Sequence, residues 1–264
     1  QSSHRDVNPL LAISTFAIDY WDTGGIVTWD IGKAAPFRAM LQKRLQRAVE
    51  LRAPVAFDLP GYPMLLHERG IGSRGDSRRE FQLECCGIKI GLSPRDSHKR
   101  QLYNYSCIMS GEACLVLGIE QGRRIVTDII SLLGGTVVDE WVKRIDLCLD
   151  VPGLSLQREL LPVFEAGHLT TTASVWNPWD GKKGKTGFTV SSRGRVTLNC
   201  YDKVIDVLRK GDGVYLAAME QRRWHGRTPD AATRIEYQVR KAWLDSYQLR
   251  TAELVLEPVF KWIN

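Results

Sequence analysis

Residues 144–150, with the sequence RIDLCLD, alternate between polar and apolar side chains. Because successive side chains of a β-strand point to opposite faces, this alternation predicts a strand with one oily face and one reactive face. The apolar face would carry Ile145, Leu147 and Leu149. The reactive face would carry Arg144, Asp146, Cys148 and Asp150.

Two later segments show the same alternation: residues 196–203, VTLNCYDK, and residues 234–240, RIEYQVR. The polar faces of these two predicted strands would carry Thr197, Asn199, Tyr201 and Lys203 from the first, and Arg234, Glu236, Gln238 and Arg240 from the second. If the three strands are neighbours, one face of the sheet gathers carboxylates, a tyrosine and several cations. Such a face could bind a divalent metal and attack a phosphate with a phenol oxygen.

The composition is that of an ordinary globular chain with a moderate basic excess. The 264 residues can bury a large core and form one or two domains. Lysine and arginine exceed the acids by 36 to 30, for a net charge of +6 and a pI near 9.0. This charge favours a polyanionic partner without proving one. No apolar run approaches the roughly 20 residues that a bilayer requires, and no signal-peptide pattern is present, so no membrane partner is expected.

The six cysteines show no CxxC pair and no Cys/His cluster with zinc spacing. They therefore favour free thiols in a reducing compartment, and a cytoplasmic location is expected. The adjacent Cys85 and Cys86 would point to opposite faces of one predicted strand, which argues against a simple bridge between them.

The pattern along the chain predicts an α+β fold. Residues 13–21 and 26–31 would form a hairpin that turns at Asp22-Thr23-Gly24-Gly25. Helices are expected at residues 37–51, 123–133, 156–166 and 253–263, with Ser155 as the cap of the third. Successive strands are expected between residues 54 and 118, including residues 114–118.

The sheet is expected to be twisted and mainly antiparallel, with helices packed on one face and DNA on the other. The order of elements would suit two related α+β halves. Residues 1–136 would form an N-terminal half for DNA binding or scaffolding, and residues 137–264 a C-terminal half that carries the catalytic strands.

The acidic side chains have two interpretations. Asp146 and Asp150 are about 13 Å apart along a strand, so Asp146 paired with Glu236 is the better candidate for binding Mg²⁺ or Mn²⁺. Alternatively, the acids pair with Arg144, Arg234 or Arg240 in a structural network. Tyr201 is likewise either a packing residue or a nucleophile, and a phenol with a pKa near 10 needs activation by a metal or Lys203.

Residues 176–187, WNPWDGKKGKTG, interleave aromatic, glycine and lysine residues. They suit a loop that stacks on bases and neutralises phosphates, or equally a solvent-exposed hairpin with buried tryptophans. The glycine and lysine spacing is not that of a phosphate-binding Walker loop. The predicted DNA contacts are Arg144, Trp179, Lys182, Lys183, Lys185, Arg193, Arg195, Arg234 and Arg240.

Taken together, RIDLCLD at 144–150, GFTVSSR at 187–193, YDK at 201–203 and RIE at 234–236 resemble the replication initiation factor family. That family includes rolling-circle plasmid and phage initiators and related conjugative relaxases. The resemblance covers residues 146–240, and residues 13–21 resemble the opening strand of the family more weakly. It departs from the family at Ser191, where glycine is frequent, and in the long aromatic and basic insertion before it.

The resemblance implies that Tyr201 is the nucleophile and that Lys203 helps to bind the scissile phosphate. Asp146 and Glu236 would hold the Mg²⁺ or Mn²⁺ ion, with Asp150 and Asp202 as weaker candidates. The metal site would be acidic, because the five histidines form no His-hydrophobe-His motif. The expected partner is origin DNA, single-stranded or extruded as a hairpin, and a helicase and a second copy of the chain are further expected partners.

The implied reaction is strand transfer, in which Tyr201 forms a 5′-phosphotyrosine and frees a 3′-hydroxyl that can prime synthesis. One alternative is a DNA-binding protein without nicking activity. Another is a metal-dependent nuclease that uses water as the nucleophile. The strand-transfer hypothesis requires that the Tyr201 hydroxyl be accessible and lie close to the two acids.

Overall fold

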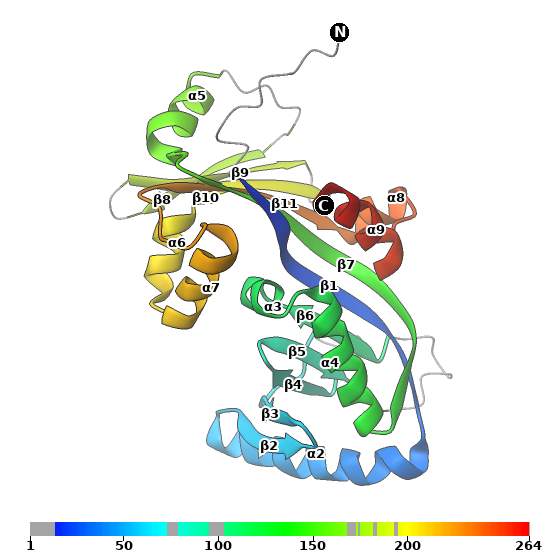
Figure 1. Cartoon of the computed structure of the whole chain (residues 1–264). Helices are drawn as coiled ribbons and strands as arrows, with labels where there is room; N and C mark the ends of the chain where they lie inside the picture. Colours follow the sequence, from blue (N-terminus) through cyan, green and yellow to red (C-terminus); the bar gives the residue numbers. More distant parts are fainter. Residues whose placement is uncertain are drawn as a thin grey trace. The chain divides into compact units, whose positions relative to one another are not determined.

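The computed structural model describes residues 14–72, 79–94, 103–167, 173, 175–181, 184–192 and 195–263, with no side-chain description for Ser192 or residues 260–263 (Figure 1). The strand order is β2-β3-β4-β5-β6-β1-β7-β11-β10-β9-β8. The strands from β2 to β1 and those from β11 to β8 in this order pair antiparallel with their neighbours. Helices accompany the strands along the chain. The predicted α+β class with a large antiparallel sheet is therefore confirmed.

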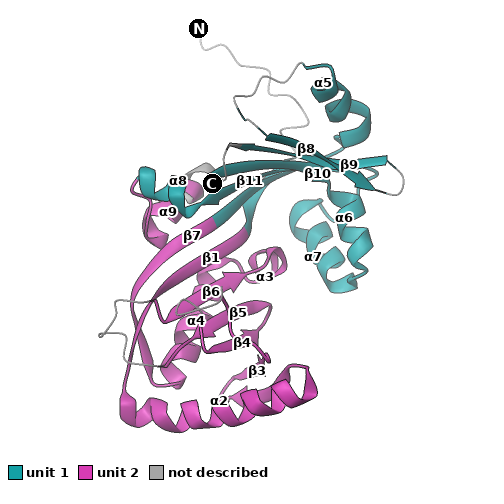
Figure 2. Cartoon of the chain, turned by 180° about the vertical axis from the view of Figure 1, so that it is seen from behind, with its two compact units in different colours: residues 1–19, 145–247, 263–264 teal, residues 20–144, 248–262 magenta. Residues whose placement is uncertain are grey.

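The chain divides into two compact units (Figure 2). Unit 1 comprises residues 1–19, 145–247 and 263–264, and unit 2 comprises residues 20–144 and 248–262. Two long strands, β1 (Thr15–Trp29) and β7 (Gly135–Pro152), contribute residues to both units. This division differs from the expected boundary between residues 136 and 137, because the chain crosses between the units within β1 and again within β7.

Unit 2 is built on short antiparallel strands that follow one another along the chain. They are β2 (Val55–Leu59), β3 (Tyr62–Leu66), β4 (Phe81–Cys85), β5 (Ile88–Leu92) and β6 (Tyr105–Met109). The helices of this unit are α2 (Ile31–Leu51), α3 (Gly111–Val116), α4 (Ile119–Leu132) and most of α9 (Ala252–Ile263). Helix α4 buries Ile125, Val126, Ile129 and Ile130 along one face, as the 3.6-residue period requires.

Two expectations for the segments of this unit are wrong. The predicted hairpin around Asp22 is one continuous strand, β1, in which Asp22 pairs with Ile108 and Gly25 with Tyr105 of β6. Gly25 does not form a turn but lets the backbone of β7 come close to β1. A Cβ atom at this position would lie 2.1 Å from the Asp139 carbonyl oxygen. Residues 114–118 are not a strand, since Ser110 caps helix α3 there by accepting from the Ala113 amide.

In unit 1, four strands follow β7 across the sheet in the order β11 (Ala232–Arg240), β10 (Val196–Asp202), β9 (Gly184–Ser192) and β8 (Val175–Gly181). Its helical elements are the π-helical turn η2 (Leu156–Leu160), α5 (Leu161–Glu165), α6 (Lys203–Lys210), α7 (Gly213–Arg223) and α8 (Lys241–Ser246). The Ser155 cap is confirmed: its hydroxyl accepts from the Arg158 amide, while Glu159 accepts from the Ser155 amide at 2.7 Å.

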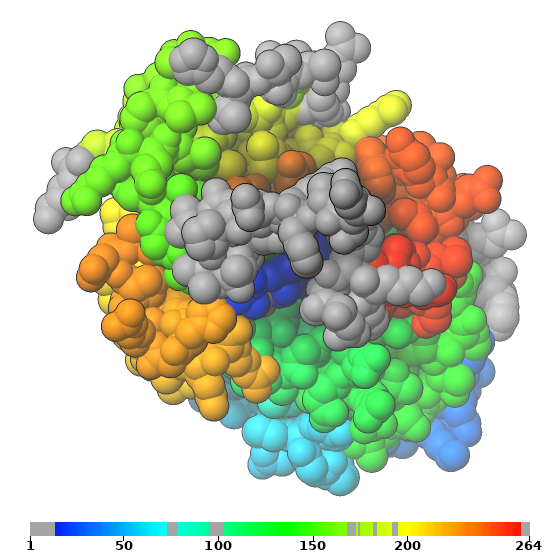
Figure 3. Space-filling model, turned by 45° about the horizontal axis from the view of Figure 1, so that its top comes forward, coloured from blue at the N-terminus to red at the C-terminus, as the bar shows by residue number. Residues whose placement is uncertain are grey.

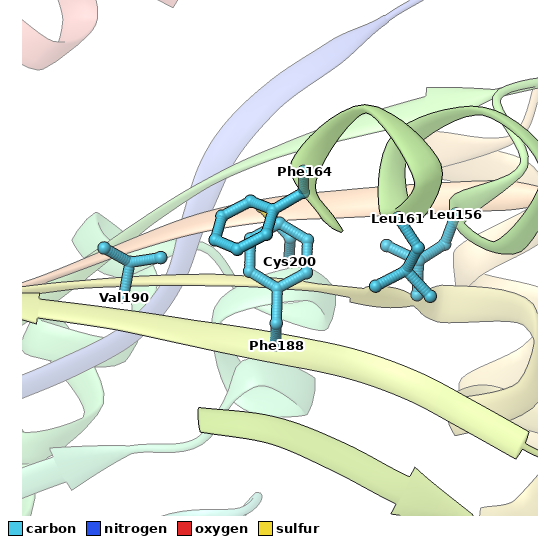
Figure 4. Packing of buried hydrophobic residues seen from close by; sticks show 6 residues of the cluster. All are labelled: Leu156, Leu161, Phe164, Phe188, Val190 and Cys200. Carbon is cyan, nitrogen blue, oxygen red and sulfur yellow. The ribbon is translucent and has the colours of Figure 1, made fainter. Parts of the chain in front are cut away.

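The apolar face predicted for β10, which carries Leu198 and Cys200, packs against η2 and α5 (Figure 4). Phe164 of α5 lies over Phe188 of β9, with ring centroids 4.4 Å apart. Alternation then directs the neighbouring side chains to the opposite face of the sheet. The buried members of this cluster are Leu156, Leu161, Phe164, Phe188, Val190 and Cys200.

Helices cover both faces of the sheet in unit 1, which corrects the expectation of helices on one face only. Figure 1 shows α5 and the α6–α7 pair on opposite sides of the strands. Arg234 of β11 reaches Met219 of α7 at 4.0 Å, on the face opposite the Phe164 cluster. In the space-filling view α6 and α7, in orange, form outer surface (Figure 3). The reactive face of these strands is therefore partly buried.

No helix among the described residues is long and apolar enough to cross a membrane.

Candidate active site

A chain of hydrogen bonds crosses the four strands from β8 to β11 on the polar face of unit 1. The Trp179 indole N–H donates to the Thr189 hydroxyl at 2.8 Å, and this hydroxyl donates to Asn199 Oδ1 at 2.9 Å. Asn199 Nδ2 then donates to Glu236 Oε1 at 3.1 Å. Asn199 lies directly opposite both Thr189 and Glu236 in the strand register, so the antiparallel pairing itself builds this chain. Its effect is to fix the orientation of the Glu236 carboxylate.

Tyr201 joins the same carboxylate from β10. Its hydroxyl donates to Glu236 Oε2 at 3.1 Å. Tyr201 pairs with Arg234 in the register, so Glu236 is its diagonal neighbour on the same face, within reach of a long side chain. The fold therefore brings the predicted tyrosine and one predicted acid into direct contact, although they are 35 residues apart in sequence.

The accessibility expected for Tyr201 is not found. The residue is 9% exposed and its hydroxyl is buried. Burial raises the pKa of Tyr201 well above 10, and the negative charges of Asp19 and Glu236 raise it further, although Arg234 opposes them. Tyr201 in this arrangement is thus a neutral hydrogen-bond donor rather than an activated phenolate.

Arg234 and Asp150 form a buried ion pair that removes both from their predicted roles. Both side chains are 0% exposed, and Arg234 donates through Nε and Nη2 to the two Asp150 oxygens at 2.5 and 2.6 Å. Arg234 Nη1 also contacts Asp19 Oδ1 at 2.5 Å. Arg234 is therefore fully buried and engaged by two carboxylates rather than available to DNA, and the lone pairs of Asp150 are engaged by the guanidinium rather than open to a metal. For these two residues the structural-network interpretation holds.

Asp146 and Glu236 are both buried, at 3% and 8% exposure. Burial raises the pKa of Glu236, and the charges of Asp19 and Asp146 raise it further. A cation bound at these acids would offset the cost of keeping their charged forms buried and close together. Carboxylate oxygens are also ligands that a hard divalent ion prefers. However, no group of three His, Cys, Asp or Glu side chains within the described residues could hold a metal. The predicted set of three thus reduces to a pair that would need ligands from the substrate or water.

Lys203, the first residue of α6, is buried beside Tyr201. Its Nζ pairs with Asp206 at 2.8 Å and lies 5.4 Å from the centre of the Tyr201 ring. The ammonium is therefore close to the phenol but is already engaged by a carboxylate. Asp202, the weaker candidate beside it, accepts from the Ile205 amide as the helix N-cap, which gives it a structural role.

The remaining predicted DNA contacts are distributed over several elements. Arg195 and Arg240 are exposed, and Lys185 pairs with Glu165 of α5. Trp179 is partly exposed on β8, with its ring centroid 5.4 Å from that of Tyr201. In unit 2, Arg144 stacks over the Tyr20 ring at 4.2 Å. Lys182, Lys183 and Arg193 lie outside the described residues.

Sequence reasoning missed two contributors to the site. Asn199 was placed on the correct face, and its spacing of two residues from Tyr201 could have indicated that both reach the same acid. Asp19 gave no usable signal, because its partner Arg234 is 215 positions away in the chain. Burial would raise the pKa of Asp19, but the charges of Arg234 and Lys203 lower it overall.

No protein-family model and no curated protein matches this chain. Among solved structures it is similar to a rolling circle replication initiator protein from Geobacillus stearothermophilus, with a TM-score of 0.46 and 11% identity. The alignment covers 86% of this chain and 74% of that one. A likeness at this level transfers no residue role.

Proposed function

We propose that this chain is a DNA strand transferase of the rolling-circle initiator type, with Tyr201 as the nucleophile. The supporting observation is the 3.1 Å hydrogen bond from the Tyr201 hydroxyl to Glu236, because it joins a potential nucleophile to a potential base. Both residues belong to the short motifs that resemble the replication initiation factor family. Tyr201 would be the nucleophile and Glu236 the base, and Asn199 would hold the Glu236 carboxylate in position. These are the three roles that such chemistry needs.

In the proposed reaction, the Tyr201 proton passes to Glu236 Oε2 as the phenol oxygen bonds to phosphorus. The bond from phosphorus to the 3′ oxygen breaks, and the departing oxygen takes up the proton that Glu236 received, which leaves a free 3′-hydroxyl and an ionised Glu236. A 5′-phosphotyrosine remains, and the reverse reaction rejoins the strand. Burial and the charges of Asp19 and Asp146 raise the pKa of Glu236, so its carboxylate is a stronger base than an ordinary one before any cation binds.

Mg²⁺ or Mn²⁺, held by Asp146 and Glu236, is part of this proposal. The ion would supply positive charge to the phosphate oxygens. Asp150 is not included among the ligands of the ion, because its carboxylate is paired with the Arg234 guanidinium. Arg234 places a fixed positive charge near Tyr201, which favours the phenolate over the phenol.

The buried Tyr201 hydroxyl does not meet the accessibility that the strand-transfer hypothesis requires, so the proposal needs the site to open when the substrate enters. The neighbouring Trp179, Thr189 and Asn199 are partly exposed, and Trp179 belongs to β8, the last strand of the sheet order. We propose that the DNA strand enters on this side and takes the place of the Trp179 ring beside Tyr201. The substrate would be an origin single strand or an extruded hairpin. A helicase and a second copy of the chain remain expected partners on the resemblance alone.

Replacing Tyr201 with Phe tests the proposal. The change removes only the hydroxyl, so nicking of a labelled origin oligonucleotide and the covalent protein–DNA band should both fall by at least about 10³-fold. Binding of the oligonucleotide should be retained. Tyr237→Phe is the matched control, because Tyr237 lies on the opposite face of β11 and is 48% exposed. It should cleave as the parent protein does.

A DNA-binding protein without nicking activity is the second candidate, and the buried, neutral Tyr201 hydroxyl favours it. In that case the acids, Arg234 and Tyr201 only stabilise the fold. DNA binding with no cleavage by the unmodified chain, with or without Mn²⁺, would support this candidate. Cleavage that persists in Tyr201→Phe without a covalent band would instead indicate a nuclease that uses water.

A further inference from the structure

The turn between β4 and β5 of unit 2 places two cysteine thiols side by side. Cys85 ends β4 and pairs with Ile88 of β5, which leaves Cys86 and Gly87 as a two-residue hairpin loop. Both loop residues have positive φ, 51° and 74°, as the tight primed turns of hairpins require. Cys86 has therefore left the strand conformation, and the expectation that the two side chains point to opposite faces of a strand does not apply.

The separation of the sulfur atoms suits a shared ligand better than a disulfide. The two Sγ atoms are 3.6 Å apart. Adjacent residues have Cα atoms about 3.8 Å apart, which is below the roughly 4.4–6.8 Å of ordinary disulfides, so a bridge would be strained. Two thiolates bound at about 2.3 Å to one soft central atom would instead lie about 3.3 Å apart at a pyramidal centre and about 3.8 Å apart at a tetrahedral one. The observed spacing is thus close to that of a chelating pair.

The surroundings give such a ligand both access and space. Cys86 is exposed, whereas the other five cysteines are buried. A cavity of about 480 Å³ adjoins the pair, and its wall combines apolar residues such as Phe57, Met64 and Leu65 with the acidic residues Asp58 and Glu84. No third His, Cys, Asp or Glu within the described residues completes a metal-holding group with the thiols. A ligand here must therefore bring its own remaining substituent, and an apolar one could pack against the Phe57, Met64 and Leu65 part of the wall.

We propose that Cys85 and Cys86 form a two-thiol site for a soft thiophilic metalloid, of which an organic trivalent arsenical is the chemical type. Soft thiolate ligands select such elements. In the reaction with an arsenic(III) oxide, two S–As bonds form, the As–O bonds break, and the two thiol protons leave with the oxygen as water. No oxidant or reductant is needed. Burial and the adjacent thiol raise the pKa of Cys85 to about 12, so the exposed Cys86 reacts first and Cys85 closes the ring.

Phenylarsine oxide, added in one equivalent to the reduced full chain, tests this site. Intact mass should show one arsenical per chain with loss of one water. A thiol count on the denatured adduct should find four of the six cysteines reactive, because two are bound. The adduct should survive an excess of a monothiol and be removed by a dithiol.

Single-residue variants locate the site. Cys86→Ser and Cys85→Ser should each weaken retention of the arsenical by about 10²-fold or more, since the second bond is intramolecular. Cys114→Ser is the control, because Cys114 is a buried single thiol in α3 and its loss should leave retention unchanged. Five reactive thiols in the denatured adduct would overturn the proposal, as would full retention in Cys86→Ser. The thiol count needs no variant, so the test stands even if Cys85→Ser does not fold.

Discussion

At the scale of single residues, Glu236 is an acid whose surroundings oppose its charge. It accepts hydrogen bonds from Asn199 and Tyr201, yet burial and the nearby Asp19 raise its pKa. Arg234 lies close enough to lower that pKa but is engaged by Asp150 and Asp19. An acid kept in such surroundings costs stability, and perturbed pairs of this kind concentrate at functional sites.

Glu236→Gln should therefore be more stable than the parent chain at pH 7. A raised folded pKa means that the folded state holds the proton more tightly, so the ionised acid destabilises it above that pKa. As pH falls through the raised pKa toward the ordinary 4.5, the parent should recover and the difference should vanish. Thermal unfolding of both proteins from pH 4 to 7 measures this. A variant that is less stable at pH 7 would contradict the assignment.

Asp206→Asn is the control of opposite sign for that experiment. Burial would raise the pKa of Asp206, but its contact with Lys203 lowers it overall. The ionised acid therefore stabilises the fold above pH 3.8, and this contribution is lost as pH falls through the lowered pKa. The variant should be less stable than the parent at pH 7 and approach it only in stronger acid.

At the scale of elements, β1 shows why a turn motif failed as a prediction. Asp-Thr-Gly-Gly is typical of a hairpin turn, but the same small residues also allow a neighbouring strand to come close. In the folded chain Gly25 lies against the backbone of β7 at Asp139, whereas Gly24 faces the flexible Lys143 side chain. Only the packing around the strand distinguishes these two uses of glycine.

Gly25→Ala should destabilise the protein far more than Gly24→Ala. The added Cβ atom at position 25 would meet a carbonyl oxygen at 2.1 Å, and the backbone cannot move aside without disturbing the strand pair. We expect a loss of about 1–3 kcal/mol or more in the free energy of unfolding. At position 24 the nearest atom is Lys143 Cε at 3.3 Å, which can shift at little cost. Urea denaturation of both variants compares them, and equal losses would contradict the close approach.

At the scale of the whole molecule, the net charge of +6 favours a polyanionic partner without identifying it. The cations that could act on it are the exposed ones, such as Arg195 and Arg240, because Arg234 is fully buried. The net charge therefore overestimates the number of cations that a polyanion could contact, because buried cations such as Arg234 are not accessible to it.

DNA binding should weaken steeply with salt and respond to Arg195 in particular. Each phosphate contact on a single strand contributes about 0.7 to the slope of log K against log salt. Arg195→Gln should reduce that slope by about 0.7, as measured by titration of a single-stranded oligonucleotide at several salt concentrations. Arg47→Gln, on the exposed side of α2 and paired with Glu50, should leave the slope unchanged. An unchanged slope in Arg195→Gln would remove this residue from the interface.

Local features of this protein follow directly from the order of its residues. Alternation assigned Cys200 and Leu198 to the oily face and Asn199 and Tyr201 to the polar one, because strand period is a property of neighbouring residues. The Ser155 cap followed equally from local hydrogen-bonding rules.

Long-range packing decides which polar groups meet and which of them are exposed to water. Arg234 finds Asp19 and Asp150 across long stretches of chain, and α6 and α7 pack over the face that local polarity had assigned to DNA. The physical reason is that ion pairing can make burial of charged side chains tolerable, so polarity in the sequence does not specify exposure. The 3.1 Å contact between Tyr201 and Glu236 and the burial of the Tyr201 hydroxyl are both products of that packing.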